Sequence, residues 1–293
     1  MAEQKNTIGP VWVVAEQIDC RLLSVSTQLI GQARKLADEL NSSVEAILLG
    51  SDIDRQAGEL IAAGADRVYL GDATDLSFYH PETYTEIIVN LAGEHRPEII
   101  LLGSTAMGRE LAPLVAGRLK TGLSAHCVDL VLDENCNLEQ RIPAYGGLIS
   151  IICPERRPQM ATVAKGVFMT PEPDESRTGE IVEIGIPEID SGRIRTLEVV
   201  REPPEGVPLE SADIIVAGGA GAGDLDGWNQ ISELADELNA ALGSTRPAVD
   251  EGWTELATMI GQSGKMVSPQ LYIGVGLSGE QQHLVGVVDA KVM

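Results

Sequence analysis

The chain has 293 residues, enough for about two domains, and 44% of them are hydrophobic, which supplies ample material for packed cores. Aromatic residues make up only 3%, so leucine, isoleucine, valine and alanine must fill those cores. The formal net charge is −23, from 21 basic and 44 acidic residues, and it argues against nucleic acid as the main partner, because phosphate backbones are bound by clustered lysine and arginine. This charge suits simple solubility, or steering toward partners with basic patches.

The N-terminus, Met1-Ala-Glu-Gln-Lys-Asn, has neither an apolar signal core nor an Arg-rich amphipathic segment. No stretch approaches the roughly 20 apolar residues that span a membrane, so we expect a cytoplasmic protein without membrane insertion. The cysteines form no CxxC pair and have no histidine at metal-ligand spacing, so we expect reduced thiols and no metal site. They are Cys20, Cys127, Cys136 and Cys153.

Strand and helix patterns alternate through the first hundred residues. Near-continuous apolar runs predict buried strands, at 10–15, 44–49, 67–70 and 98–102. Apolar residues at helical spacing predict helices, at 29–40, 57–64 and 81–93. This alternation predicts a parallel, doubly wound sheet.

A polar loop, Gly103-Ser-Thr-Ala-Met-Gly-Arg109, follows the fourth strand and feeds a helix led by Met107. It stands where α/β folds bind ligands, and Ser104, Thr105 and the helix N-terminus would suit an anion. A nucleotide-binding enzyme acting through this 103–109 loop is therefore one hypothesis. The other is a capped helix whose Arg109 faces solvent or a partner.

The pattern changes from residue 128 onward. Short segments separated by turns predict antiparallel strands, at 129–132, 138–142 and 148–153. Two later segments are strand-like, at 181–186 and 195–200. Successive prolines in 201–208 oppose both helix and central strand, so we predict a linker there between domains at 1–200 and 209–293.

The second domain opens with a strand at 213–216 that runs into the Gly-rich turn 217–223. An apolar stripe then predicts a helix that ends at Gly243, and its members are Ile231, Leu234, Ala235, Leu238 and Leu242. A strand, a Gly-rich turn and a helix can present backbone N–H groups to a phosphate. An ordinary turn between buried elements has the same sequence.

Three Gly- and Ser-rich loops follow near the carboxyl end. They read Gly243-Ser-Thr-Arg-Pro-Ala-Val-Asp250, Met259-Ile-Gly-Gln-Ser-Gly-Lys265 and Gly276-Leu-Ser-Gly-Glu-Gln-Gln-His283. Glycine lets a backbone approach a bulky ligand, and the residues between the glycines are mostly neutral donors with one guanidinium and one imidazole. The set suits a large, planar, polar ligand that carries phosphate. Gly274-x-Gly276-x-x-Gly279 also matches the dinucleotide fingerprint, but without its acidic residue about twenty positions on.

Taken together, the three loops resemble the FAD-binding C-terminal domain of the alpha subunit of electron transfer flavoproteins. That family shows Gly-x-Ser-Arg-x-x-Val-Asp, then Gln-Val-Gly-Gln-Thr-Gly-Lys, then Gly-Ile-Ser-Gly-x-x-Gln-His. Thr105-Ala-Met-Gly-Arg109 and Leu119-Lys-Thr-Gly-Leu123 are similar to signatures of the family's N-terminal domain, where they are not the flavin site.

The resemblance implies an α/β fold in two domains: an N-terminal doubly wound parallel sheet with an added antiparallel portion, and a C-terminal Rossmann-like FAD-binding domain. It also implies an alpha-type subunit that binds FAD and forms a heterodimer with a beta-type subunit. Such a carrier has no substrate of its own. It relays electrons from acyl-CoA dehydrogenase-like donors to a quinone-reducing or other acceptor, as in fatty acid β-oxidation.

The resemblance also implies roles for single residues. Arg246 would sit beside the isoalloxazine ring and stabilise its reduced, anionic forms. Ser263 would face the flavin N5 edge, and His283 would hydrogen-bond the pyrimidine carbonyl edge. Gln262 would meet the ring or ribityl chain, and Ser278 and Gln282 the ribityl or pyrophosphate oxygens. The other expected cofactor-binding residues are Gly219, Thr245, Gly264 and Gly279.

The chain departs from the family pattern at two places that bear on FAD. Ala220 stands where the family's first Gly-rich turn carries an arginine. The family also continues beyond Met293 with a strand and an Asp-rich loop that contact the adenosine half of FAD, so we expect the second domain to lack its usual C-terminal end. A degenerate, alpha-like scaffold subunit that holds little or no FAD is therefore an alternative.

Overall fold

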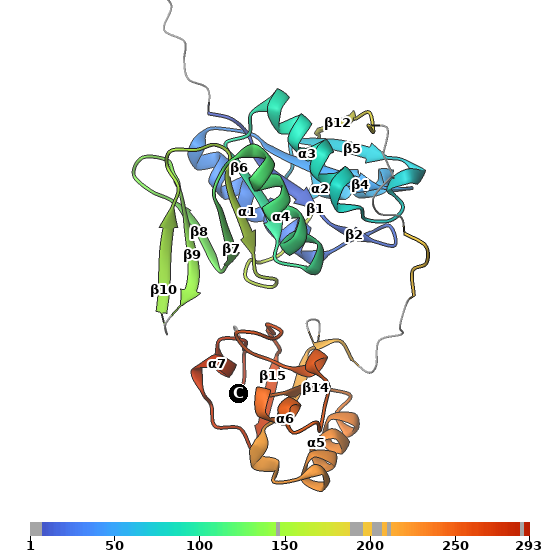
Figure 1. Cartoon of the computed structure of the whole chain (residues 1–293), viewed down its shortest axis with the longest axis vertical. Helices are drawn as coiled ribbons and strands as arrows, with labels where there is room; N and C mark the ends of the chain where they lie inside the picture. Colours follow the sequence, from blue (N-terminus) through green and yellow to red (C-terminus); the bar gives the residue numbers. More distant parts are fainter. Residues whose placement is uncertain (1–7, 145–146, 188–195, 201–206, 210–211, 288–289) are drawn as a thin grey trace, which may run out of the picture. The chain divides into compact units, whose positions relative to one another are not determined.

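The computed structural model describes residues 8–144, 147–187, 196–200, 207–209, 212–287 and 290–293. The chain divides into two compact units, Met1–Leu197 and Glu198–Met293 (Figure 1). In the parts of the chain so described, none of the helices is both long and apolar enough to cross a membrane.

The first unit is built on a seven-stranded sheet in the order β12-β5-β4-β1-β6-β11-β7, in which every neighbouring pair is parallel. Its strands are β1 (Val11–Ala15), β4 (Val44–Gly50), β5 (Arg67–Asp72), β6 (Ile99–Gly103), β7 (Leu123–Cys127), β11 (Gln159–Val163) and β12 (Glu180–Glu183). The chain adds β4 and β5 on one side of β1 and then β6, β7 and β11 on the other, so the order reverses between β1 and β6, and β12 is added last beside β5.

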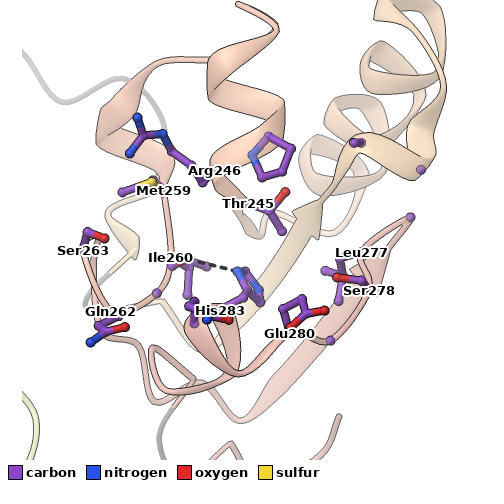
Figure 2. Close-up of a pocket in the computed structure, with 17 residues that line it drawn as sticks. Thr245, Arg246, Met259, Ile260, Gln262, Ser263, Leu277, Ser278, Glu280 and His283 are labelled. Carbon is purple, nitrogen blue, oxygen red and sulfur yellow. Dashed lines mark hydrogen bonds between the residues drawn. The ribbon is translucent and has the colours of Figure 1, made fainter. Parts of the chain in front are cut away.

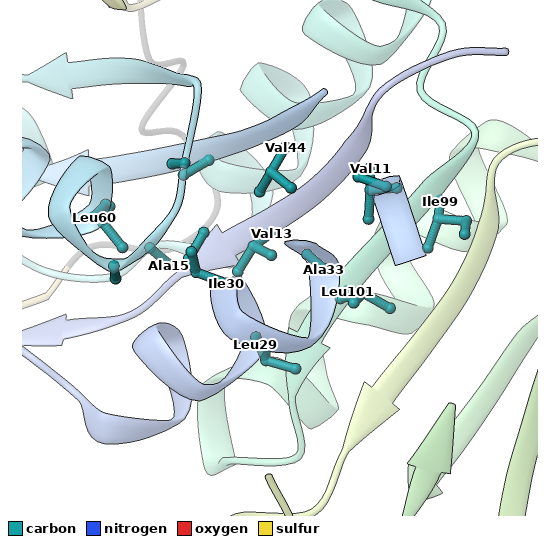
Figure 3. Close-up of a cluster of buried hydrophobic side chains, with 14 of the residues drawn as sticks. Val11, Val13, Ala15, Leu29, Ile30, Ala33, Val44, Leu60, Ile99 and Leu101 are labelled. Atoms are coloured by element: carbon teal, nitrogen blue, oxygen red, sulfur yellow. The ribbon is translucent and has the colours of Figure 1, made fainter. Parts of the chain in front are cut away.

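Helices cover both faces of this sheet. They are α1 (Ser24–Leu40), α2 (Asp54–Ala63), α3 (Pro81–His95) and α4 (Ala106–Leu119). Successive side chains of a strand point to opposite faces, so Val11 and Val13 share one core cluster with residues of α1 and α2 (Figure 3), and Trp12 shares the other with residues of α3 and α4. The predicted parallel, doubly wound sheet is confirmed.

The added antiparallel portion is also confirmed. It consists of β8 (Asp129–Leu132), β9 (Leu138–Ala144) and β10 (Gly147–Ile152), with β10 at one edge. Leu130 of β8 and Leu138 of β9 join the core on the α1 face of the large sheet. The short elements of this unit are β2 (Gln17–Ile18), β3 (Arg21–Leu22) and the 3₁₀ turn Thr74–Leu76.

The second unit contains a three-stranded parallel sheet in the order β14-β13-β15. Its elements are β13 (Ile214–Gly218), α5 (Leu225–Glu237), β14 (Ala241–Ser244), α6 (Arg246–Asp250), β15 (Leu271–Val275), α7 (Gln281–Leu284) and the 3₁₀ turns Ala220–Ala222 and Leu256–Thr258. Ile231 and Ala235 of α5 pack on Val216 of the central strand. This unit supplies the expected strand, glycine turn and helix.

Two predictions about secondary structure were wrong. The helix predicted to run through Leu242 ends at Glu237, because Asn239 takes the left-handed conformation (φ 49°) and the chain turns into β14. Leu242 and Gly243 are therefore strand residues. The segment 196–200 is irregular instead of a strand. Residue 195 and most of the predicted linker, 201–206, lie outside the described residues, and the linker stays a prediction.

Candidate functional site

A cavity of about 540 Å³ lies at the carboxyl edge of the second unit's sheet. Its walls come from the loop after β14, the loop around Ile260–Ser263, the loop after β15, and the glycine turn after β13 (Figure 2). The carboxyl ends of parallel strands meet at one edge, so the three motifs converge although they are far apart in sequence. The volume lies within the range of cofactor sites.

The two glycine loops after β13 and β15 are packed directly against each other. Gly221 N–H donates to the Gly276 carbonyl at 2.7 Å. Gly276 has φ +64°, and a Cβ on it would lie 2.6 Å from Ala222 N. A Cβ on Gly219 would lie 2.5 Å from the Gly276 oxygen. Side chains at these glycines would therefore force the loops apart.

Eight of the ten residues predicted from sequence line the cavity, and the other two support it from behind. The lining residues are Thr245, Arg246, Gln262, Ser263, Ser278, Gly279, Gln282 and His283. Gly219 lies behind the Gly276–Leu277 backbone. Gly264 closes the turn of its loop by donating to the Gly261 carbonyl at 2.9 Å. Whether these residues bind a cofactor stays a prediction.

Sequence reasoning missed several lining residues. Met259, Ile260 and Leu277 supply apolar surface, and Glu280 adds a carboxylate. Figure 2 shows Arg246, Met259, Gln262 and Ser263 along one side, Leu277, Ser278 and Glu280 along the other, and Thr245 and His283 between them. Apolar residues beside a glycine motif look like ordinary core, so only the position of Glu280 inside the third motif could have drawn attention to it.

The Thr245 hydroxyl is a buried polar group without a hydrogen-bond partner in the described part of the chain. Thr245 is 9% exposed and occupies the N-cap position of α6, yet Oγ1 makes no capping bond and no other hydrogen bond to the described residues. Leaving such a hydroxyl unpaired costs about 1–3 kcal/mol, so its placement favours a partner that enters the cavity.

Four other polar side chains of the lining also make no hydrogen bond to the part of the chain that the structure describes. They belong to Gln262, Ser263, Ser278 and Gln282. Two of them carry amides, and two carry hydroxyls that can donate or accept. Such a set can satisfy the carbonyl and imino groups of a planar heterocycle and the hydroxyls of a polyol chain.

The cavity carries little net positive charge. Arg246 is the only arginine or lysine among the described residues that line it, and its Nε donates to Asp250 Oδ1 at 2.7 Å. Both partners are more than half exposed, so the pair is a solvated one of modest strength. Glu280 brings a negative charge to the opposite wall. The phosphates of a ligand would therefore depend mainly on backbone N–H groups.

His283 is buried (7% exposed), with protein partners at both ring nitrogens. Nδ1 lies 3.0 Å from the Ile260 carbonyl oxygen, and Nε2 lies 2.6 Å from the Tyr272 hydroxyl. Burial lowers the pKa of His283 below its ordinary value, against a smaller opposing effect of the Ile260 carbonyl. Burial also raises the pKa of Tyr272. The flavin hydrogen bond predicted for His283 stays a prediction, with both nitrogens already engaged.

In the first unit, the carboxyl group of Glu16 lies against the 103–109 loop. Thr105 caps α4 by accepting from Gly108 N at 2.8 Å, and its hydroxyl donates to Glu16 Oε2 at 2.7 Å. The other oxygen of this carboxyl group would lie 2.9 Å from a Cβ at Gly103 and 3.3 Å from one at Gly108. A carboxyl group therefore occupies the positive end of α4, where a bound anion would have to compete with it.

Two family profiles match the chain, one in each of its two units. The family profile described as "Electron transfer flavoprotein domain" matches residues 11–189, and the one described as "Electron transfer flavoprotein FAD-binding domain" matches residues 208–288. An electron transfer flavoprotein subunit alpha of Thermoanaerobacterium thermosaccharolyticum is 44% identical, over 97% of this chain and 87% of the relative. One of Megasphaera elsdenii is 42% identical, over 99% and 86%. Protein FixB of Clostridium saccharobutylicum is 41% identical, over 97% and 85%.

The fold and the cavity thus define a two-domain α/β protein whose second domain is of the flavin-binding class. More narrowly, the chain belongs to the electron transfer flavoprotein family, as an alpha-type subunit. The Thr245 hydroxyl and the amides and hydroxyls around it, which have no hydrogen-bond partners within the described ranges, fit a flavin nucleotide.

Proposed function

We propose that the chain binds FAD in this cavity and, paired with a beta-type subunit, relays electrons between a dehydrogenase and an acceptor. FAD when bound would supply the redox chemistry. The chain's own residues would bind, orient and shield it: the loop side chains would pair with the ring and ribityl groups, and the glycine backbone would accommodate the pyrophosphate. The observation that carries this proposal is the buried Thr245 hydroxyl at the cavity, which has no hydrogen-bond partner among the residues that the structure describes.

The partner subunit is supported by relatives and by an exposed strand edge. Two relatives of this chain, each 34% identical to it, are named as subunits of larger proteins. One is acryloyl-CoA reductase electron transfer subunit beta of Anaerotignum propionicum, and the other is a subunit of a lactate dehydrogenase of Acetobacterium woodii. In the first unit, β10 pairs only with β9 among the described strands, and it exposes Leu148, Ile149 and Ile152. An exposed apolar edge strand has unpaired backbone groups that can form hydrogen bonds with another chain.

We propose an acyl-CoA dehydrogenase-like donor, or another dehydrogenase, and a quinone-reducing or other acceptor. The relatives' names span a reductase and a lactate dehydrogenase, which favours this wider donor class over fatty acid β-oxidation alone. The acidic net charge would steer the protein toward partners with basic patches.

One observation favours the scaffold subunit as a second candidate. Arg246, the single arginine among the lining residues that the structure describes, is paired with Asp250. Glu280 faces it across the cavity, and Ala220 adds no charge. A dianionic pyrophosphate would find little side-chain charge here. The nucleotide-binding enzyme is disfavoured, because Glu16 fills the end of α4.

Flavin content separates the candidates. The chain is co-purified with its beta-type partner, and the absorbance spectrum and FAD per heterodimer are measured before and after titration with FAD, FMN and riboflavin. The proposal expects about one additional FAD per heterodimer relative to the beta-type partner alone, with FAD binding more tightly than the two smaller flavins. A heterodimer that gains no flavin from this chain even in excess FAD would establish the scaffold instead.

A further inference from the structure

We propose that Tyr272 is a positioning residue of the flavin site: its hydroxyl holds His283 and, through His283, the loop that carries Gln262 and Ser263. This inference rests on the proposed function, because bound flavin is the group against which the loop would be positioned. Tyr272 is the second residue of β15 and is 3% exposed, and it does not belong to the cavity lining. Nothing in the three glycine-rich motifs points to it.

The two hydrogen bonds of His283 determine which nitrogen carries the proton. A carbonyl oxygen can only accept, so His283 Nδ1 must donate to Ile260 O. In the neutral ring Nε2 is then an acceptor, and the Tyr272 hydroxyl donates to it. Tyr272 therefore stabilises the Nδ1–H tautomer, and the three groups form one chain across β15, α7 and the loop.

The peptide that receives this chain is the pivot of the loop. Ile260 O and Gly261 N belong to one peptide plane, and Gly261 has φ +140°, a conformation that glycine adopts readily. His283 Nδ1–H donates to the oxygen of this peptide, Ile260 O. The N–H of the same peptide, Gly261 N, donates to the Lys265 carbonyl at 3.2 Å. Gln262 N donates to Gln282 O at 2.7 Å. Fixing this plane therefore fixes where the side chains of the next two residues point.

Two substitutions of His283 distinguish a role through the Ile260 carbonyl from a direct hydrogen bond between His283 and the flavin. An asparagine amide nitrogen can take the position of Nδ1, and a glutamine amide nitrogen that of Nε2. If His283 acts through Nδ1–H and the Ile260 carbonyl, His283→Asn should bind FAD at least about threefold more tightly than His283→Gln, the difference that one hydrogen bond makes. The opposite ranking would overturn the inference.

A second experiment removes only the Tyr272 hydroxyl. In the heterodimer, Tyr272→Phe should weaken the binding of FAD about three- to tenfold and shift the reduction potential of the bound flavin. Tyr84→Phe is the matched control, since it removes a buried hydroxyl that donates to the Leu49 carbonyl in the first unit. It should leave both quantities at wild-type values. Wild-type FAD affinity and reduction potential in Tyr272→Phe would overturn the inference.

A third measurement needs no variant of Tyr272 and no flavin. ¹⁵N chemical shifts of the imidazoles report the tautomer, and His283 can be assigned among the four histidines by its loss in His283→Asn. We expect protonated Nδ1 and unprotonated Nε2; the reverse would overturn the inference. A wild-type heterodimer that gains no FAD from this chain would overturn the proposed function instead, and the tautomer would still test the hydrogen-bond chain.

Discussion

Arg246 Nε donates to Asp250 Oδ1 at 2.7 Å across one turn of α6, so the cation predicted to face the flavin is already paired with an acid of the same motif. Cationic charge near a flavin raises its reduction potential, because reduction adds negative charge. A neighbouring carboxylate works in the opposite direction and also restricts the guanidinium. If flavin binds here, its reduction potential would therefore depend on both residues.

We expect Arg246→Ala to lower the flavin reduction potential and Asp250→Asn to raise it. The pair is solvent-exposed, so the shift for Asp250→Asn should be modest, about 10–20 mV, corresponding to about 0.5–1 kcal/mol for a two-electron reduction. Spectroelectrochemical titration measures both shifts. Shifts of the same sign in the two variants would remove Arg246 from the electrostatic environment of the flavin.

The Thr245 hydroxyl should affect binding and stability differently. Thr245→Val keeps the shape and removes a hydroxyl that caps nothing, so the free energy of unfolding without flavin should stay the same or rise by up to about 1 kcal/mol. Affinity for FAD should fall about three- to tenfold, as expected for one lost hydrogen bond. Denaturant unfolding and flavin titration measure the two effects.

Thr162→Val provides the matched control for Thr245→Val. The Thr162 hydroxyl is buried in β11 and accepts from His126 N at 2.9 Å, so its loss should cost about 1–3 kcal/mol of stability and leave FAD binding unchanged. If Thr245→Val instead loses stability like the control and keeps its affinity, the hydroxyl has a structural role only.

The sequence predicts the parts of this fold whose side chains carry a local signal. β1, β4 and β6 are almost wholly apolar, as strands buried on both faces must be, and the three glycine motifs identify most of the cavity lining. β11 gave no such signal, because Gln159 and Thr162 are buried within it. Its place between β6 and β7 depends on pairing with distant strands.

Long-range contacts also account for what the sequence missed at the site. Leu242 continues the apolar stripe of α5, but its pairing with Val216 makes it a strand residue. Tyr272, His283 and Ile260 come from three segments, and only the fold brings them together. The third motif predicts that His283 lies near a ligand, but the direction of its ring nitrogens follows from partners outside that motif.

Glu16 should make the stability of the first unit depend on pH. Burial raises the pKa of this carboxyl from 4.5 to about 7, although its bond from Thr105 works in the opposite direction. The folded protein therefore favours the protonated acid. The stability this provides is fully present below pH 4.5 and is lost as the pH rises through 7, by about 3 kcal/mol in total.

Glu16→Gln tests this pH dependence, since glutamine cannot ionise. Urea unfolding is measured at several pH values between 4.5 and 8.5. The free energy of unfolding of the variant should rise relative to that of the wild type as the pH rises. The exposed Glu172→Gln is the control and should follow the wild type. A constant difference between Glu16→Gln and wild type across this range would mean that Glu16 is ionised throughout.

The exposed edge of β10 should contribute to binding of the beta-type partner. Leu148 is 60% exposed, so Leu148→Lys should change the free energy of unfolding by less than about 0.5 kcal/mol. Burying a lysine in an apolar interface should nevertheless weaken heterodimer formation about tenfold, as expected for an interface residue of moderate weight. Met169→Lys is the matched control, because Met169 is 89% exposed and lies outside β10. Analytical ultracentrifugation of the mixed subunits measures the affinity, and equal weakening by both variants would indicate a general effect of added charge instead of an interface at β10.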